Sequence, residues 1–190
     1  NPFSGTDTYK SIAELPLNQR VIEMKKEDIK NKILSEDPIK GSTFPLINRI
    51  GYSQMYRFGS PPNYNPKPEH SIESLAKVNE VSSAELAYDI LLENEGNNFI
   101  YAPLVNYADH TFGVCQKMLE DKNAIMGLGD GGAHVGFILD AGYPTWLISY
   151  WSVKKNVFSM EETVRRLTSD TALAAGLKDR GYLKVGLKAD

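Results

Sequence analysis

One carboxylate and one imidazole stand close together in the glycine-rich stretch NAIMGLGDGGAHVG, residues 123–136. Asp130 lies among four glycines, and His134 follows four residues later. A carboxylate in this setting can act as a general base, as a metal ligand, or as both. The glycines leave room for a substrate and provide backbone N–H groups for an oxyanion. The alternative interpretation is a glycine-rich turn with a solvated Asp130 and a packed His134.

The residues around this cluster predict elements that would position it. A short apolar run, residues 124–128, is typical of a buried strand, and residues 99–105 (FIYAPLV) form a second such run. A helix is expected between them, over residues 109–120. We therefore predict a parallel βαβ unit over residues 99–132 with a right-handed crossover. Asp130 would lie at the carboxyl end of its strand, where the active sites of α/β folds are found.

The other histidines and the cysteine are weaker candidates for a catalytic or metal-binding role. His110 stands at a predicted strand–helix junction and could face the same site or lie at the surface. His70 ends the proline-rich segment SPPNYNPKPEH, residues 60–70, which we expect to be a surface loop. Cys115 belongs to an apolar helix face, which indicates packing rather than catalysis. The sequence contains no His-x-His pair, the usual source of adjacent zinc ligands.

Composition excludes several classes of protein. The chain has 190 residues, 42% hydrophobic and 24% charged, with a net charge of −3, which fits a soluble globular domain. No apolar run approaches the ~18 residues of a membrane span, and no signal peptide opens the chain, so we expect a cytoplasmic protein. The mild acidity argues against nucleic-acid binding, and the single cysteine excludes an internal disulfide. The glycine spacing matches no phosphate-binding pattern, and Asp130 would repel a phosphate.

Helix signals dominate the rest of the chain. A lysine-rich helical stretch should end at Asp37-Pro38, because the residue before a proline disfavours the helical conformation. Residues 50–58 (IGYSQMYRF) alternate well enough for a strand. Ser82 with Glu85, and Ser159 with Glu162, form capping boxes. We expect further helices over residues 71–79, 82–96, 145–153, 159–167 and 171–175.

Several of these segments resemble a known family. GLGDGGAHVG, YPTWLISYW and VRRLTSDTALAAGLKDRGYLKVGLKAD look like the C-terminal part of the amidohydrolase superfamily. The closest match is the N-acyl-D-amino-acid deacylase (D-aminoacylase-like) branch, which NPFSGTDTYKSIAELPLNQRV, YDILLENEG and FIYAPLVNYAD also resemble. The resemblance implies an α/β, helix-rich chain that forms the last strands and helices of a partial (β/α)8 barrel. Residues 1–75 would be an inserted N-terminal arm, residues 76–180 the barrel portion, and residues 181–190 the start of a β-sandwich return strand.

The resemblance also implies zinc-assisted hydrolysis of a linear amide, most directly N-acyl-D-amino acid deacylation. Asp130 matches the family's Asp at the end of the eighth barrel strand, which lies at the metal centre, takes a proton from the attacking water and hands it to the leaving amine. Gly131, Gly132 and His134 would line the substrate pocket. The family's remaining metal-binding residues have no counterpart here. We therefore expect zinc in the full-length enzyme, and none, with no activity, in this C-terminal fragment.

Other readings stay open. A cyclic-amide hydrolase or a deaminase of the same superfamily would share the Asp that matches Asp130. A non-catalytic interaction module could also descend from the fold. Because a partial barrel would expose strand edges, we expect self-association, most simply as a two-fold dimer. The expected partner of the enzyme is a small N-acyl amino acid, with no nucleic acid and no membrane.

Overall fold

The structure is a computed structural model that describes residues 1–40, 50–127 and 140–188 of the chain. Asp130, Gly131, Gly132 and His134 therefore lie outside the described residues.

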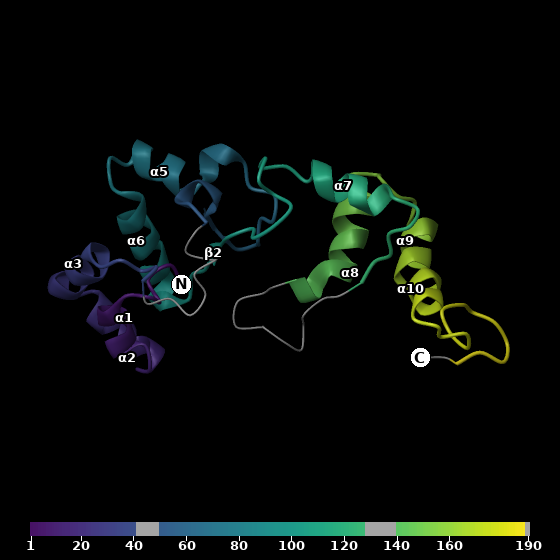
Figure 1. Cartoon of the computed structure of the whole chain (residues 1–190), viewed down its shortest axis with the longest axis horizontal. Helices are drawn as coiled ribbons and strands as arrows, with labels where there is room; N and C mark the ends of the chain where they lie inside the picture. Colours follow the sequence, from purple (N-terminus) through teal and green to yellow (C-terminus); the bar gives the residue numbers. More distant parts are fainter. Residues whose placement is uncertain (41–49, 128–139, 189–190) are drawn as a thin grey trace. The chain divides into compact units, whose positions relative to one another are not determined.

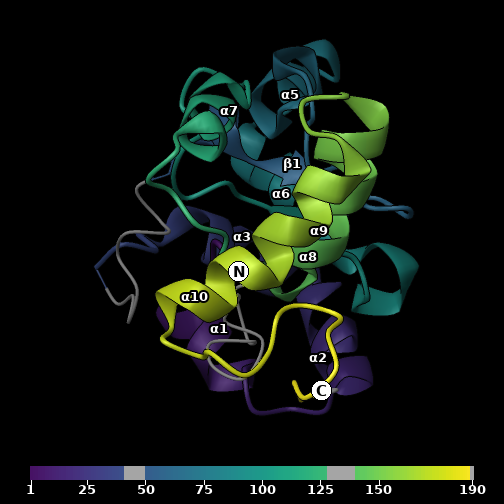
Figure 2. The same cartoon turned by 90° about the vertical axis from the view of Figure 1, so that its right-hand side faces the viewer.

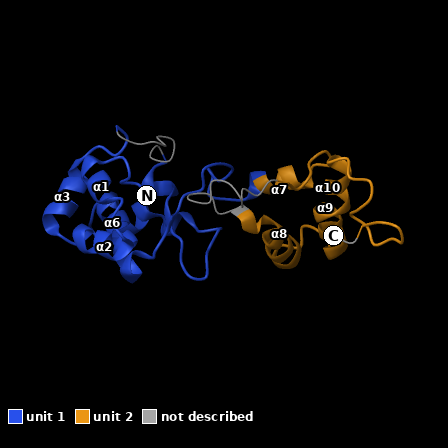
Figure 3. Cartoon of the chain, turned by 90° about the horizontal axis from the view of Figure 1, so that it is seen from below, with its two compact units in different colours: residues 1–114 blue, residues 115–190 orange. Residues whose placement is uncertain are grey.

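The chain divides into two compact units, residues 1–114 and residues 115–190 (Figure 3). The predicted arm over residues 1–75 and barrel portion over residues 76–180 stay predictions. Each unit is built mainly from helices (Figure 1).

Three helices open unit 1: α1 (Asp7–Ile12), α2 (Leu17–Met24) and α3 (Glu27–Ser35). The lysine-rich stretch is thus two helices, because the backbone of Lys26 is extended and α3 begins with two carboxylates in its first turn. Glu36 is extended after the end of α3, which confirms that the helix stops before Asp37-Pro38.

Two capped helices follow, α5 (Ile72–Val78) and α6 (Ser83–Gly96). The Ser71 hydroxyl accepts a hydrogen bond from the Ser74 amide at 3.2 Å, and the Ser82 hydroxyl accepts one from the Glu85 amide at 3.1 Å. Both predicted starts are confirmed, since an N-cap oxygen satisfies an amide that the helix leaves free. The regular part of α6 is shorter than predicted, because the backbone of residues 93–95 is not helical.

The core of unit 1 gathers around Tyr88 in α6. Its ring meets that of Phe3 edge-on, with the centroids 5.4 Å apart, and its hydroxyl donates a 2.7 Å hydrogen bond to the carbonyl oxygen of Met24. Burial, with a smaller contribution from the negative charge of Asp89, raises the pKa of Tyr88 to about 12. The other buried members of this core are Ile12, Ile33, Met55, Ile72, Ala87 and Ile90.

The described sheet is small and antiparallel. Strand β1 (Tyr56–Arg57) follows the 3-10 helix η1 (Tyr52–Gln54) and pairs with β2 (Ile100–Tyr101), Tyr56 opposite Tyr101. The strand predicted over residues 50–58 is thus reduced to two residues. The proline-rich segment is largely exposed, as predicted, and ends in a second 3-10 helix, η2 (Pro68–His70).

The parallel βαβ prediction is wrong for the described part of residues 99–132. Its first strand pairs antiparallel over two residues, and the side chain of Val105 is 74% exposed. Residues 123–127 form no strand, and the side chain of Ile125 is 56% exposed. An apolar run becomes a buried strand only where neighbours pair its backbone and cover its side chains, and the exposed side chains of Val105 and Ile125 lack that cover.

Unit 2 contains most of α7 (Gly113–Glu120), the 3-10 helix η3 (Asp140–Gly142), α8 (Tyr143–Trp146), η4 (Leu147–Lys154), α9 (Met160–Leu167) and α10 (Ser169–Ala174). The predicted tryptophan-bearing helix is α8 running into η4, a π-helix in which the Lys155 amide donates to the Tyr150 carbonyl. The predicted cap of α9 is confirmed, since the Ser159 hydroxyl accepts from the Glu162 amide at 3.1 Å. Helices α9 and η4 pack against each other (Figure 2).

The last described residues of unit 2 form a loop. Residues 181–188 carry turns where a return strand was expected, and the side chains of Leu183 and Val185 are wholly exposed. The Lys188 amide donates a 2.8 Å hydrogen bond to the Asp179 carbonyl and so closes the loop. In the described part of the chain, helices are too short or too polar to cross a bilayer.

Candidate functional site

The segments on either side of the glycine-rich cluster help to form a hollow in unit 2. The hollow has a volume of about 250 Å³. Met126, which precedes Asp130, and Tyr143, which follows it in sequence, both line the hollow. The lining residues come from α7, from the segment after it, and from α8 with η4: Cys115, Met118, Leu119, Met126, Tyr143, Trp146, Leu147 and Trp151.

Helix geometry explains the α7 wall. Cys115, Met118 and Leu119 are spaced by three and four residues, so they share one helix face. The sequence assigned Cys115 to packing, and the half-buried thiol does lie in an apolar wall. The sequence did not predict the hollow itself, because no pattern within α7 indicates that its apolar face lies near Trp146 and Trp151.

The indoles of Trp146 and Trp151 also line the hollow, and the ring of Tyr150 contacts both. The rings of Trp146 and Tyr150 are parallel within 9° at 4.4 Å between centroids, and Tyr150 meets Trp151 edge-on at 5.1 Å. Both are favoured geometries for aromatic pairs. The Nζ atoms of Lys154 and Lys155 each lie 5.7 Å from the centre of the Tyr150 ring. These aromatic rings are therefore held by contacts on several sides.

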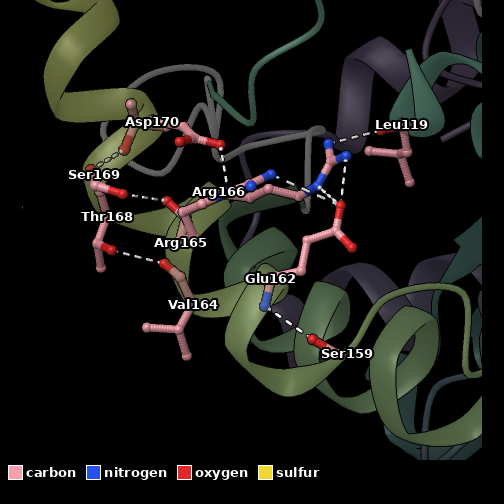
Figure 4. Close-up of polar contacts among 10 residues, drawn as sticks. Leu119, Ser159, Glu162, Val164, Arg165, Arg166, Thr168, Ser169 and Asp170 are labelled. Atoms are coloured by element: carbon pink, nitrogen blue, oxygen red, sulfur yellow. Dashed lines mark hydrogen bonds and ion pairs between the residues drawn. The ribbon is translucent and has the colours of Figure 1, made fainter. Parts of the chain in front are cut away.

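Arg166 of α9 joins this helix to α7 by hydrogen bonding (Figure 4). Its Nη1 donates to the carbonyl oxygen of Leu119 at 2.8 Å, while Nε and Nη2 donate to Oε1 of Glu162 at 3.0 and 2.9 Å. The guanidinium also lies 4.4 Å from the centre of the Phe158 ring, and the side chain is only 11% exposed. Because Leu119 lies in the last turn of α7, Arg166 satisfies a carbonyl that the helix leaves free and complements the helix dipole.

His110 lies in a separate polar cluster within unit 1. Its Nδ1 shares a 2.5 Å hydrogen bond with the hydroxyl of Tyr56, a buried residue whose pKa is raised by burial. The His110 backbone is left-handed, with φ of +55°, which is uncommon for a residue with a side chain. The ring also meets Tyr107 edge-on at 6.4 Å. His110 is therefore a partly buried, hydrogen-bonded histidine and not a simple surface one. The alternative prediction, that it faces the same site as Asp130, falls outside the described residues.

The described residues do not supply a zinc cage. No three side chains of His, Cys, Asp or Glu gather around a common point in residues 1–40, 50–127 and 140–188. His70 is exposed, as the sequence predicts. The side chains that the sequence singles out for chemistry, Asp130 and His134, belong to the undescribed segment.

Comparison with known proteins assigns this chain to no family. A scan against protein-family models, a search of curated proteins and a search of solved structures each find no match to this chain. The likeness to amidohydrolases therefore depends on the sequence motifs alone.

Proposed function

We propose that this chain is the C-terminal portion of a metal-dependent amidohydrolase that cleaves a linear amide, most directly in an N-acyl-D-amino acid. The observation that carries the proposal is the sequence Asp-Gly-Gly-Ala-His at residues 130–134, a lone carboxylate in a glycine cradle. The hollow in unit 2 supports it, since Met126 and Tyr143 from both sides of this sequence line a space for an apolar substituent.

In this proposal Asp130 moves the proton. Its carboxylate accepts a proton from water as the water oxygen bonds to the amide carbon. Backbone N–H groups of Gly131 and Gly132 stabilise the resulting oxyanion, and His134 donates a hydrogen bond to a substrate oxygen. The C–N bond then breaks as the proton passes from Asp130 to the leaving amine. Asp130 would also be the chain's own metal ligand.

A substrate panel tests this assignment. The full-length protein that contains this chain should hydrolyse N-acyl-D-amino acids faster than hydantoins or aminated heterocycles. Faster turnover of a hydantoin or an aminated heterocycle would instead identify a cyclic-amide hydrolase or a deaminase. No turnover of any member would contradict the enzyme proposal and favour an interaction module.

Exposed apolar side chains favour a second proposal, self-association through unit 2. Leu173, Leu183 and Val185 all expose most of their side chains, and an exposed apolar surface favours contact with another chain. A two-fold homodimer is the simplest assembly that would cover them. We place the protein in the cytoplasm, where the single Cys115 would stay reduced.

A further inference from the structure

We propose that the hollow in unit 2 is a subsite for one uncharged, ring-sized apolar group. The group belongs to the amide substrate, so this assignment rests on the proposed function and gives its substrate class. The amides that bind best would carry an aromatic ring or a branched alkyl group of similar size.

The volume of the hollow sets the size of the group. At about 250 Å³ it exceeds an engineered apolar cavity of roughly 150 Å³ that binds benzene. It is smaller than the roughly 300–1,000 Å³ of sites that enclose a whole drug-sized ligand. The hollow therefore fits one ring with a short linker, and the rest of a substrate would extend outside it.

The chemistry of the walls sets the polarity of the group. The described lining residues include no carboxylate, ammonium or guanidinium group. Two methionines, Met118 and Met126, and two indoles, Trp146 and Trp151, face the space, and thioethers and indoles both make favourable contacts with aromatic rings. A charged substituent would lose its hydration here without gaining a partner among these described lining residues.

The walls are also held in place before a ligand arrives. Arg166 bonds the end of α7, which carries Met118, and the stacked Tyr150 supports Trp146 on the other side. A pre-formed site avoids part of the ordering cost of binding. Binding should therefore be measurable in this chain without turnover.

Tryptophan fluorescence gives a direct test. The chain contains two tryptophans, and both line the hollow, so their emission reports its occupancy. Titration of the Asp130→Asn variant with phenylacetamide should give a saturable change in emission, and acetamide should give none. An absence of saturation with phenylacetamide would overturn the proposal.

Two positions on α7 provide matched variants. Met118 lines the hollow and Val114 does not, although their side chains are similarly exposed. Met118→Gln should weaken phenylacetamide binding about tenfold, because an amide would be desolvated in an apolar wall. Val114→Gln and the conservative Met118→Leu should bind as the parent does. Equal affinity in Met118→Gln and Val114→Gln would place the ligand elsewhere and overturn the proposal.

Competition assigns the subsite to the substrate. N-phenylacetylglycine carries its ring on the acyl side, and N-acetyl-D-phenylalanine carries it on the amino-acid side. Displacement of phenylacetamide by either supports the proposal and identifies the side, whereas displacement by neither would overturn the assignment. Because binding is read without turnover, retained binding by this chain with no hydrolysis by the wild-type full-length protein would contradict only the proposed function.

Discussion

Nη1 of Arg166 lies 2.8 Å from the carbonyl oxygen of Leu119, 47 positions earlier in the chain. This hydrogen bond joins α9 to the last turn of α7 and so fixes one wall of the hollow (Figure 4). The neighbouring Arg165 also pairs with a carboxylate, Asp170 at 3.2 Å, but its side chain is 56% exposed. The two arginines differ in burial and thus in what they contribute.

Arg166→Met should destabilise unit 2 by about 2 kcal/mol, because hydrogen bonds to charged groups contribute about 1.5–3 kcal/mol. Glu162 would keep only its longer, 3.8 Å ion pair with Arg165. Arg165→Met is the matched control and should cost less than about 1 kcal/mol, as exposed ion pairs do. Urea unfolding measures both. Equal losses of unfolding free energy in the two variants would show that the hydrogen bond to Leu119 adds no stability beyond that of an exposed ion pair.

Tyr88 should make the protein less stable in alkali. Its pKa is raised to about 12, whereas a tyrosine in the unfolded chain ionises near 10. Between these values the unfolded chain binds fewer protons than the folded chain, so the free energy of unfolding falls as the pH rises from 10 to 12. Unfolding curves across this range measure the slope. Tyr88→Phe should flatten it, and an unchanged slope in that variant would contradict the role of Tyr88.

Gly96 and Gly176 are a matched pair of left-handed glycines, with φ of +82° and +74°. A Cβ at Gly96 would lie 2.5 Å from Cγ2 of Val21, whereas one at Gly176 meets nothing within 4 Å. Gly176→Ala should cost about 1–2 kcal/mol from the backbone alone, and Gly96→Ala should cost more because α2 must also shift. Thermal unfolding of the two variants ranks them, and a smaller loss at Gly96 would contradict the close packing against Val21.

The exposed apolar loop at the end of unit 2 should drive self-association. Leu183→Lys combined with Val185→Lys should lower the apparent mass by light scattering, because charges would replace two wholly exposed apolar side chains. Leu17→Lys in unit 1 is the control and should leave the mass unchanged. A monomer mass for the unmodified chain over a wide concentration range would rule out the dimer.

Local signals predicted the helix starts well. The oxygens of Ser71, Ser82 and Ser159 each accept from an amide three residues later, an interaction that lies within a few residues and can be seen in the sequence. The end of α3 before Asp37-Pro38 was also predicted from neighbouring residues, because the residue before a proline disfavours the helical conformation.

Distant pairings could not be predicted in the same way. Tyr56 pairs with Tyr101 in the sheet, and Leu119 bonds Arg166, so both contacts depend on how separate segments meet. The apolar runs at 99–105 and 124–128 predicted buried strands, but burial needs a covering layer that no short run specifies. The hollow was missed for the same reason, since no local pattern in α7 or η4 specifies that their apolar side chains meet.

Turnover by Asp130→Asn in the full-length protein tests most directly whether Asp130 is the general base in amide hydrolysis. With N-acyl-D-amino acids as substrates, kcat should fall roughly 10²–10⁴-fold with KM little changed, because Asn cannot accept the proton. Asp28→Asn, an exposed carboxylate of α3, is the control and should keep full activity. Turnover by Asp130→Asn equal to that of the control would contradict Asp130 as the general base and, with it, the proposed mechanism.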